Sequence, residues 1–378
     1  MPTSAAQRLP MQSLEMLRGI LATYVLIGHA RWLLWAGHAA WLASQPPLWQ
    51  YPFAYGSAAF RFGREAVLVF FALSGFFIHL ASAGAAPGRA QFSARTFYRR
   101  RIHRLVPPYV FALVVTIIFD LLGRMRFPAL YFAQTGDALL DATMRQAGYS
   151  AASVLPAVLL LPSSAQFDFG TNGPLWSLAY EVVYYAVYPA WLWLRVRNAG
   201  AALVLVPLAC LFGGPYLPVA FPSSVVSLYP VWIAGAALAE WVLRSKSNAV
   251  MRGVAVILAP CGLAVYTVAP SSWVRVSGAV VFAVAVVYLF ASMPFPRSSV
   301  ATAGAYLGTR SFSIYIVHFP ILVLMSAACF QTFGARPMSG WLAVVGAASA
   351  IALACVAFWT CERHFLHRRA ALAESAAA

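Results

Sequence analysis

The first apolar stretch of the chain, Leu14 to Gly37, contains two ionisable residues, Arg18 and His29. In a helix, at about 100° per residue, their side chains share one stripe, and the imidazole lies roughly 16 Å further along the axis than the guanidinium. With Arg18 at one membrane surface, His29 lies near the middle of the hydrocarbon. A titratable group there indicates a functional site that faces the protein interior or a water-filled cavity. The alternative is a core histidine that bonds to a neighbouring helix.

Acyl transfer is a chemistry that fits this pair of residues. A neutral imidazole can remove the proton from a hydroxyl as that hydroxyl attacks an acyl carbon. The planar fork of Arg18 suits the phosphate oxygens of a donor that arrives from the cytoplasm. Arg101 and Arg104 are three residues apart, share a helical face and form a second cationic pair. Anchoring at the cytoplasmic surface is the alternative for this pair, and it is our interpretation of the neighbouring Arg95, Arg99 and Arg100.

Two further apolar runs contain an ionisable residue. In the segment Asn172-Gly-Pro-Leu-Trp-Ser-Leu-Ala-Tyr-Glu181, the glutamate lies about two turns into a helix, at roughly the depth that His29 reaches from the other side. A carboxylate there must be paired or protonated. It could orient an imidazole, bind a sugar hydroxyl, or pair with a buried arginine or tyrosine. His318, in Ser313-Ile-Tyr-Ile-Val-His-Phe-Pro, has a structural and a functional interpretation that the sequence does not separate.

Three other residues are candidates for contact with a substrate, together with His318. Glu65 stands beside Arg64 at the start of an apolar run, and a surface ion pair is the alternative. Trp176 offers a flat ring on which a sugar can stack, although tryptophan is also common at membrane interfaces. Asn172 opens the segment that leads to Glu181.

The composition is that of a membrane protein. The chain is 62% hydrophobic and 10% charged, and apolar runs long enough to cross a bilayer recur along it. We therefore predict an all-α, polytopic transmembrane bundle that forms a single domain over residues 1–378. The net charge of +16 does not indicate nucleic-acid binding, because the basic residues collect at the ends of apolar runs. No cysteine or histidine spacing suggests a metal site.

The apolar runs predict about ten spans. The fourth opens at Asn172-Gly173-Pro174 and ends near Arg195, and the piece 151–162 is too short for a full crossing. Pro107 and Pro108 are expected in the first turn of the third span. The other nine spans are expected at about 15–36, 62–84, 105–123, 200–213, 225–243, 252–269, 275–292, 303–328 and 340–361.

The arginine distribution predicts which side each end occupies. With a cytoplasmic N-terminus, the strongest basic run lies inside, as the positive-inside rule requires. Both termini are then cytoplasmic, with a short tail from about residue 362. The basic residues assigned to the cytoplasm are Arg8, Arg89, Arg95, Arg99, Arg100, Arg101, Arg104, Arg195, Arg197, Arg244, Lys246, Arg252, Arg297, Arg363, Arg368 and Arg369.

These segments together resemble the acyltransferase 3 family of membrane acyltransferases. The matching pieces are Arg18 with His29, Phe70-Phe-Ala-Leu-Ser-Gly75, Arg101-x-x-Arg104, Gly173-Pro-Leu-Trp-Ser-Leu-Ala-Tyr-Glu181 and Ser313-Ile-Tyr-Ile-Val-His318-Phe-Pro. They occur in the family's order and extend from the first expected span to the ninth.

The resemblance implies transfer of an acetyl or other acyl group from acyl-CoA to a hydroxyl. Family acceptors are bacterial surface glycans, such as O-antigen or exopolysaccharide, and sometimes small secondary metabolites. It also implies that His29 is the catalytic histidine, with Arg18 in its motif and Arg101 and Arg104 on the acyl-CoA side. The expected location is the bacterial inner membrane, with acetyl-CoA as co-substrate and no tightly bound cofactor.

Two departures from the family pattern stand out. Many members have an acidic residue before the Phe-Phe of the second span, where this chain has Leu68, with Glu65 three residues earlier. Some relatives carry a further C-terminal esterase-like domain, whereas here a short basic tail follows Glu362. A further transfer step is therefore expected either to need a separate partner or not to occur.

The expected mechanism places the CoA nucleotide against Arg18, Arg101 and Arg104, with its pantetheine arm reaching inward. His29 is the general base for direct attack by an acceptor hydroxyl, and the alternative is that His29 takes the acyl group itself; Glu181 and His318 line the acceptor side. The alternative from another class is a transporter or flippase for a lipid-linked saccharide. A purely structural membrane subunit does not explain three ionisable residues at membrane depth. The acceptor, the acyl chain length and the oligomeric state stay open.

Overall fold

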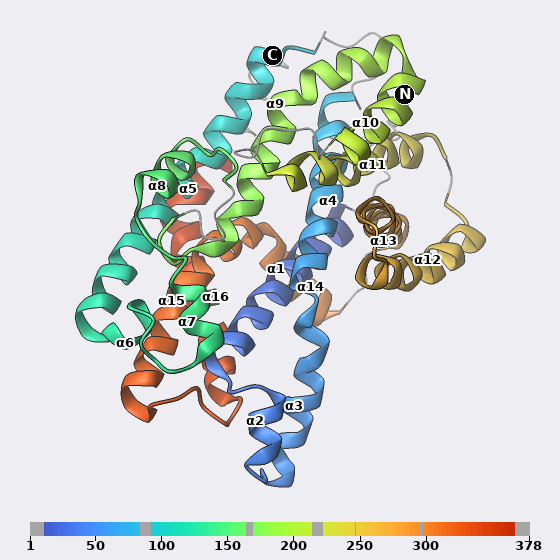
Figure 1. The fold of residues 1–378 in the computed structure, drawn as a ribbon. Coiled ribbons are helices and arrows are strands. Elements are labelled where there is room, and N and C mark those ends of the chain that lie inside the picture. Colours follow the sequence, from blue (N-terminus) through green and yellow to red (C-terminus); the bar gives the residue numbers. More distant parts are fainter. Residues whose placement is uncertain are drawn as a thin grey trace. The chain divides into compact units, whose positions relative to one another are not determined.

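A computed structural model describes residues 11–83, 92–163, 169–213, 222–245, 247–294 and 298–366, and it is built from helices (Figure 1). The described residues contain no strand, only one isolated bridge between Gly148 and Gly170, which confirms the all-α prediction. The helices are α1 (Met11–Leu34), α2 (His38–Ala43), α3 (Tyr51–Ser57), α4 (Gly63–Ala83), α5 (Ala94–Arg126), α6 (Pro128–Tyr131), α7 (Ala138–Met144), α8 (Ala151–Val158), α9 (Trp176–Arg197), α10 (Val206–Gly213), α11 (Ser223–Arg244), α12 (Ala249–Val268), α13 (Ser272–Ser292), α14 (Ser299–Thr309), α15 (Ser311–Phe333) and α16 (Trp341–Ala357).

Seven helices among the described residues are long and apolar enough to cross a bilayer: α4, α5, α11, α12, α13, α15 and α16 with its continuation to Leu366. The chain is thus a multi-pass membrane protein. Helices α1 and α9 have similar lengths, 24 and 22 residues, but charged residues in α1 and tyrosines and tryptophans in α9 lower their hydropathy. The total of ten spans and the cytoplasmic position of both ends stay predictions.

The structure corrects two expected spans. Arg310 separates α14 from α15, so the run expected at 303–328 is two helices, and the long one begins at Ser311. Helix α5 begins at Ala94, and therefore Pro107 and Pro108 lie inside it rather than in its first turn. Arginine is a good helix former, so the basic run extends the helix beyond its apolar part. Of the basic residues behind the predicted orientation, Arg8, Arg89, Lys246, Arg297, Arg368 and Arg369 lie outside the described residues.

The chain packs as two compact units, each assembled from separate segments. One comprises 22–63, 95–178 and 310–378, and we call it the histidine unit because it contains His29 and His318. The second unit comprises 1–21, 64–94 and 179–309. The prediction of a single domain is not tested by this division.

The core of the histidine unit positions the second half of α1 against α15. Leu33 and Leu34 of α1 lie in one buried cluster with Leu322 and Val323 of α15, and residues of α6, α7 and α16 also belong to it. The Ser326 hydroxyl of α15 donates to the Leu33 carbonyl at 2.8 Å. This seam lies one turn beyond His29 and His318, and so it holds their two helices together.

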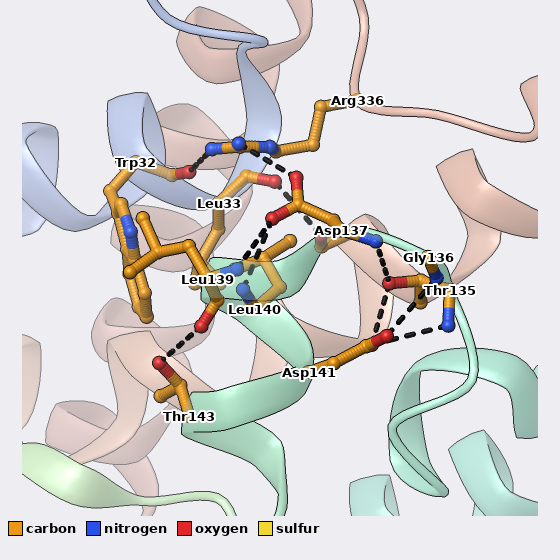
Figure 2. A network of polar contacts seen from close by, with 11 residues as sticks. Trp32, Leu33, Thr135, Gly136, Asp137, Leu139, Leu140, Asp141, Thr143 and Arg336 are labelled. Atoms are coloured by element: carbon orange, nitrogen blue, oxygen red, sulfur yellow. Dashed lines mark hydrogen bonds and ion pairs between the residues drawn. The ribbon is translucent and has the colours of Figure 1, made fainter.

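Arg336 closes the end of this seam (Figure 2). Its guanidinium donates to the Trp32 carbonyl at 3.1 Å and pairs with Asp137 at 2.7 Å. Trp32 has one of the last carbonyls of α1, which have no partner within the helix. Asp137 in turn caps α7 by accepting from the backbone N–H groups of Leu139 and Leu140. One side chain therefore connects the ends of α1 and α7.

Replacing Arg336 with alanine leaves the Trp32 carbonyl and the Asp137 carboxylate without this donor. The side chains of Arg336 and Asp137 are both largely buried, so we expect a loss of about 1–3 kcal/mol, seen as a lower thermal unfolding midpoint of the purified protein. Arg126→Ala is the matched control, because Arg126 is exposed at the end of α5 and its loss is expected to cost less than about 0.5 kcal/mol. Equal shifts for the two variants would contradict the role of Arg336.

Close helix contact and one charged cluster organise the second unit. A Cβ added at Gly75 of α4 would lie 2.0 Å from the Trp232 carbonyl of α11, and one at Gly235 would lie 1.9 Å from that of Ala72. Only glycine permits this approach.

At the last turns of these helices, Glu240 accepts from Arg195 at 2.6 Å and contacts His79 at 2.9 Å. This ion-pair cluster connects α4, α9 and α11.

Candidate active site

His29 and His318 meet inside the histidine unit. Nδ1 of His29 lies 2.8 Å from Nε2 of His318, and the ring planes differ by 9°. The ring centroids are 5.1 Å apart, which equals the N···N distance plus about one ring radius at each end. The two nitrogens therefore lie on the line between the rings, and the hydrogen bond runs in the plane of both. This is the orientation in which the lone pair of one imidazole faces the N–H of the other.

The two histidines differ in exposure. His318 is fully buried, whereas His29 keeps part of its surface accessible. The Phe319 ring lies nearly perpendicular to the His29 ring, with centroids 5.1 Å apart, and Trp32 packs beside Phe319. His29, a partly exposed residue, thus has its ring in contact with both Phe319 and His318. This arrangement suits a base that must meet a substrate.

Asn172 compensates for a break in the hydrogen bonds of α15. Pro320 lacks an N–H, so the carbonyl of Ile316, four residues earlier, has no helical donor. The Asn172 side-chain amide donates to that carbonyl at 2.9 Å and to the Thr116 hydroxyl oxygen at 3.0 Å. Asn172 is fully buried; its amide nitrogen donates to both of these partners, and its Oδ1 has no hydrogen-bond partner among the described residues. Its expected contact with a substrate stays a prediction, but the structure gives it a supporting role two residues from His318.

A double-mutant cycle tests this compensation. Asn172→Ala leaves a buried carbonyl without a donor and is expected to cost about 1–3 kcal/mol. Pro320→Ala supplies the missing N–H, so the double variant should be more stable than Asn172→Ala alone in thermal unfolding. Strictly additive shifts would show that Asn172 does not substitute for the missing backbone donor.

The loop before α9 is anchored by a buried carboxylate. Asp120 of α5 accepts from the Thr171 N–H at 2.9 Å, the Thr171 hydroxyl at 2.6 Å and the Tyr149 hydroxyl at 2.8 Å. Burial, and next the Asp120 charge, raise the pKa of Tyr149 above its usual value, so its phenol stays protonated and donates. Ser177 at the start of α9 lies 2.6 Å from the Tyr315 hydroxyl, oxygen to oxygen. The segment that contains Asn172 and Trp176 is therefore fixed at both ends.

Arg101 and Arg104 belong to the same unit as the two histidines. They lie three residues apart in α5, before its apolar part, and both are partly buried. The Arg101 guanidinium lies over the Phe97 ring at 5.6 Å. Arg99 and Arg100, by contrast, are exposed. Arg101 and Arg104, which are predicted to bind the acyl donor, therefore differ in burial from the neighbouring arginines.

The other predicted site residues, Arg18, Glu65 and Glu181, belong to the second unit. Arg18 pairs with Glu15 at 3.2 Å within α1. Glu181 accepts from the Tyr185 hydroxyl, one turn later in α9, and that hydroxyl also lies 3.0 Å from the Ser74 hydroxyl. The tyrosine partner agrees with the structural alternative for Glu181, and its role toward an imidazole or a sugar stays a prediction. Glu65 is partly buried in the first turn of α4.

Several residues of the site escape the sequence-based interpretation. Glu15 lies three residues before Arg18, and this spacing, which is visible in the sequence, would have indicated an ion pair within the helix. The need of the Ile316 carbonyl for an outside donor follows from Pro320, but no local signal identifies Asn172 as that donor. The His29–His318 contact joins residues 289 positions apart and has no sequence signal of its own.

The comparisons with known proteins identify the class. The sequence matches the acyltransferase domain family, Acyl_transf_3, over residues 11–360, and the chain therefore belongs to this family, as its motifs predict. Together with the seven apolar helices, this makes it a multi-pass membrane acyltransferase.

Two curated relatives are similar over much of the chain. Acyltransferase MdmB of Streptomyces mycarofaciens is 26% identical over 345 residues, which cover 81% of this chain and 79% of that protein. Peptidoglycan O-acetyltransferase OatA of Listeria monocytogenes is 27% identical over 297 residues, covering 69% of this chain and 45% of the longer relative. This chain thus corresponds to less than half of the length of OatA. No solved structure is detectably similar.

Proposed function

We propose that the protein transfers an acyl group, in the first place acetyl, from acyl-CoA on the cytoplasmic side to a hydroxyl of a surface polysaccharide. The observation that carries this proposal is the paired histidine: His29, a partly exposed residue in an apolar unit, is hydrogen-bonded to the fully buried ring of His318. The name of one relative, peptidoglycan O-acetyltransferase, supports a glycan hydroxyl as acceptor. The protein is proposed to lie in the bacterial inner membrane with both ends in the cytoplasm.

In the proposed reaction His29 is the general base. Its free ring nitrogen takes the proton of the acceptor hydroxyl as the oxygen attacks the thioester carbonyl. The tetrahedral intermediate collapses with cleavage of the C–S bond, and the CoA sulfur leaves with the proton that His29 took. One ester and one free thiol form, and the imidazole returns to its neutral state. Arg101 and Arg104 are proposed to bind the phosphates of the donor, and the expected role of Arg18 toward the donor stays a prediction.

The free thiol separates this function from its alternative, a transporter or flippase for a lipid-linked saccharide. Purified protein in liposomes is supplied with acetyl-CoA and a membrane glycan fraction, and thiol release is followed with a thiol-reactive dye. An acyltransferase releases CoA in proportion to acceptor, and the acetyl group of labelled donor appears on the glycan. A carrier releases none. Acceptor-independent release would indicate thioester hydrolysis and would contradict the proposal.

Arg101→Gln and Arg104→Gln are expected to raise the KM for acetyl-CoA about tenfold or more, with kcat little changed. The reason is that each charge-assisted hydrogen bond to phosphate contributes about 1.5–3 kcal/mol to binding. Arg99→Gln and Arg100→Gln remove exposed charges from the same helix and serve as controls with wild-type KM. If all four variants behave alike, these arginines anchor the helix at the membrane surface and do not bind the donor.

A further inference from the structure

We propose that His318 is a positioning residue, which sets the tautomer of His29 so that Nδ1 carries the ring proton and Nε2 presents the lone pair. The importance of this tautomer for turnover rests on the proposed function. The tautomer itself follows from the hydrogen bonds around the two rings.

Two backbone carbonyls beside His318 determine which of its ring nitrogens carries the proton. Its Nδ1 lies 3.0 Å from the carbonyl oxygen of Ile314 and 2.8 Å from that of Tyr315. Carbonyl oxygens only accept, so Nδ1 of His318 must carry a hydrogen. In the neutral ring, Nε2 is then the nitrogen with the lone pair.

The hydrogen bond between the two rings then determines which nitrogen of His29 carries the proton. Since Nε2 of His318 accepts, the nitrogen 2.8 Å away, Nδ1 of His29, must donate. The in-plane alignment of the rings gives this bond good geometry. In the neutral His29 ring the remaining nitrogen, Nε2, is unprotonated and can act as the base.

The backbone that supplies the two carbonyls is itself held in place. Ile314, Tyr315 and Ile316 are consecutive in α15; the first two carbonyls accept from His318, and the third accepts from Asn172. The Thr116 hydroxyl donates to the Ala112 carbonyl at 2.8 Å, so its oxygen is free to accept from Asn172. Asn172, Thr116 and Pro320 thus stabilise the helix segment that determines the proton position on His318.

This chain of hydrogen bonds predicts an order of activity among variants of His318. His318→Phe fills the site but has no acceptor for the His29 N–H, and we expect kcat to fall about a hundredfold or more with unchanged KM values. His318→Gln places an amide near the former Nε2. Its NH₂ can donate to the α15 carbonyls, which turns its oxygen toward His29, so activity within about tenfold of wild type is expected. His318→Asn is too short to reach His29 and should resemble His318→Phe.

A direct measurement does not depend on activity. The protein, with ¹⁵N-labelled histidines, is placed in nanodiscs near pH 8, and the His29 signals are identified by their loss in His29→Ala. Wild type should show an N–H nitrogen at Nδ1 and an unprotonated nitrogen at Nε2, and His318→Phe should lose this preference. A proton on Nε2 of wild-type His29 would overturn the proposal, as would wild-type kcat in His318→Phe. Full activity of His29→Ala would instead refute the proposed function and leave the tautomer assignment intact.

Discussion

Replacement of His29 with alanine is expected to abolish acyl transfer while the protein stays folded and inserted. General base catalysis contributes about 10²–10⁴-fold to a rate, and the alanine variant has no other group at that position. We therefore expect acceptor-dependent thiol release to fall at least about a thousandfold. The measurement is the liposome assay with labelled acetyl-CoA.

The control for this variant must show that only the chemistry is lost. The loss of His29 leaves Nε2 of the buried His318 without its donor, so the unfolding midpoint is expected to fall about as much as in Asn172→Ala, which serves as the stability reference, while the protein stays folded. His38→Ala removes a histidine from α2 in the same unit and should leave turnover near wild type. Retained turnover in His29→Ala would end the assignment of the base.

Replacement of Glu240 with alanine is expected to give the largest loss of stability. Its carboxylate holds His79 at 2.9 Å and Arg195 at 2.6 Å, and its side chain is only 15% exposed. Breaking a buried pair by removal of one partner leaves an uncompensated charge and costs about 3–5 kcal/mol when the pair is fully buried. For this largely buried pair we expect about 2–4 kcal/mol, measured as a lower thermal midpoint.

Arg244 provides the matched control in the same cluster. It lies 3.4 Å from Glu240 but is 74% exposed, so Arg244→Ala should cost less than about 0.5 kcal/mol. The double variant Glu240→Ala, Arg195→Ala removes both charges and should lose less than the sum of the single variants. Equal losses for Arg195→Ala and Arg244→Ala would show that burial does not set the strength of this cluster.

The sequence was sufficient for the parts of the fold that depend on local patterns. The apolar runs of α4, α11, α12 and α13 begin and end within a few residues of their expected limits. The break at Arg310 was not predictable in this way, because the apolar pattern continues across it and only the packed backbone shows two helices. The start of α5 was mispredicted for the opposite reason. Helix propensity continues through the arginine run, whereas hydropathy marks only the part of the helix that prefers lipid.

At the candidate site, the sequence alone determined the class of the protein and the set of ionisable residues worth testing, while the membrane depth of His29 stays a prediction. Only the tertiary structure decided that His318 is the neighbour of His29 and that Asn172 serves a carbonyl freed by Pro320. Periodicity reports which face of a helix is apolar, and composition reports which runs prefer lipid. Neither carries information on which faces meet, because that choice is made by side-chain packing and hydrogen bonds between segments hundreds of residues apart.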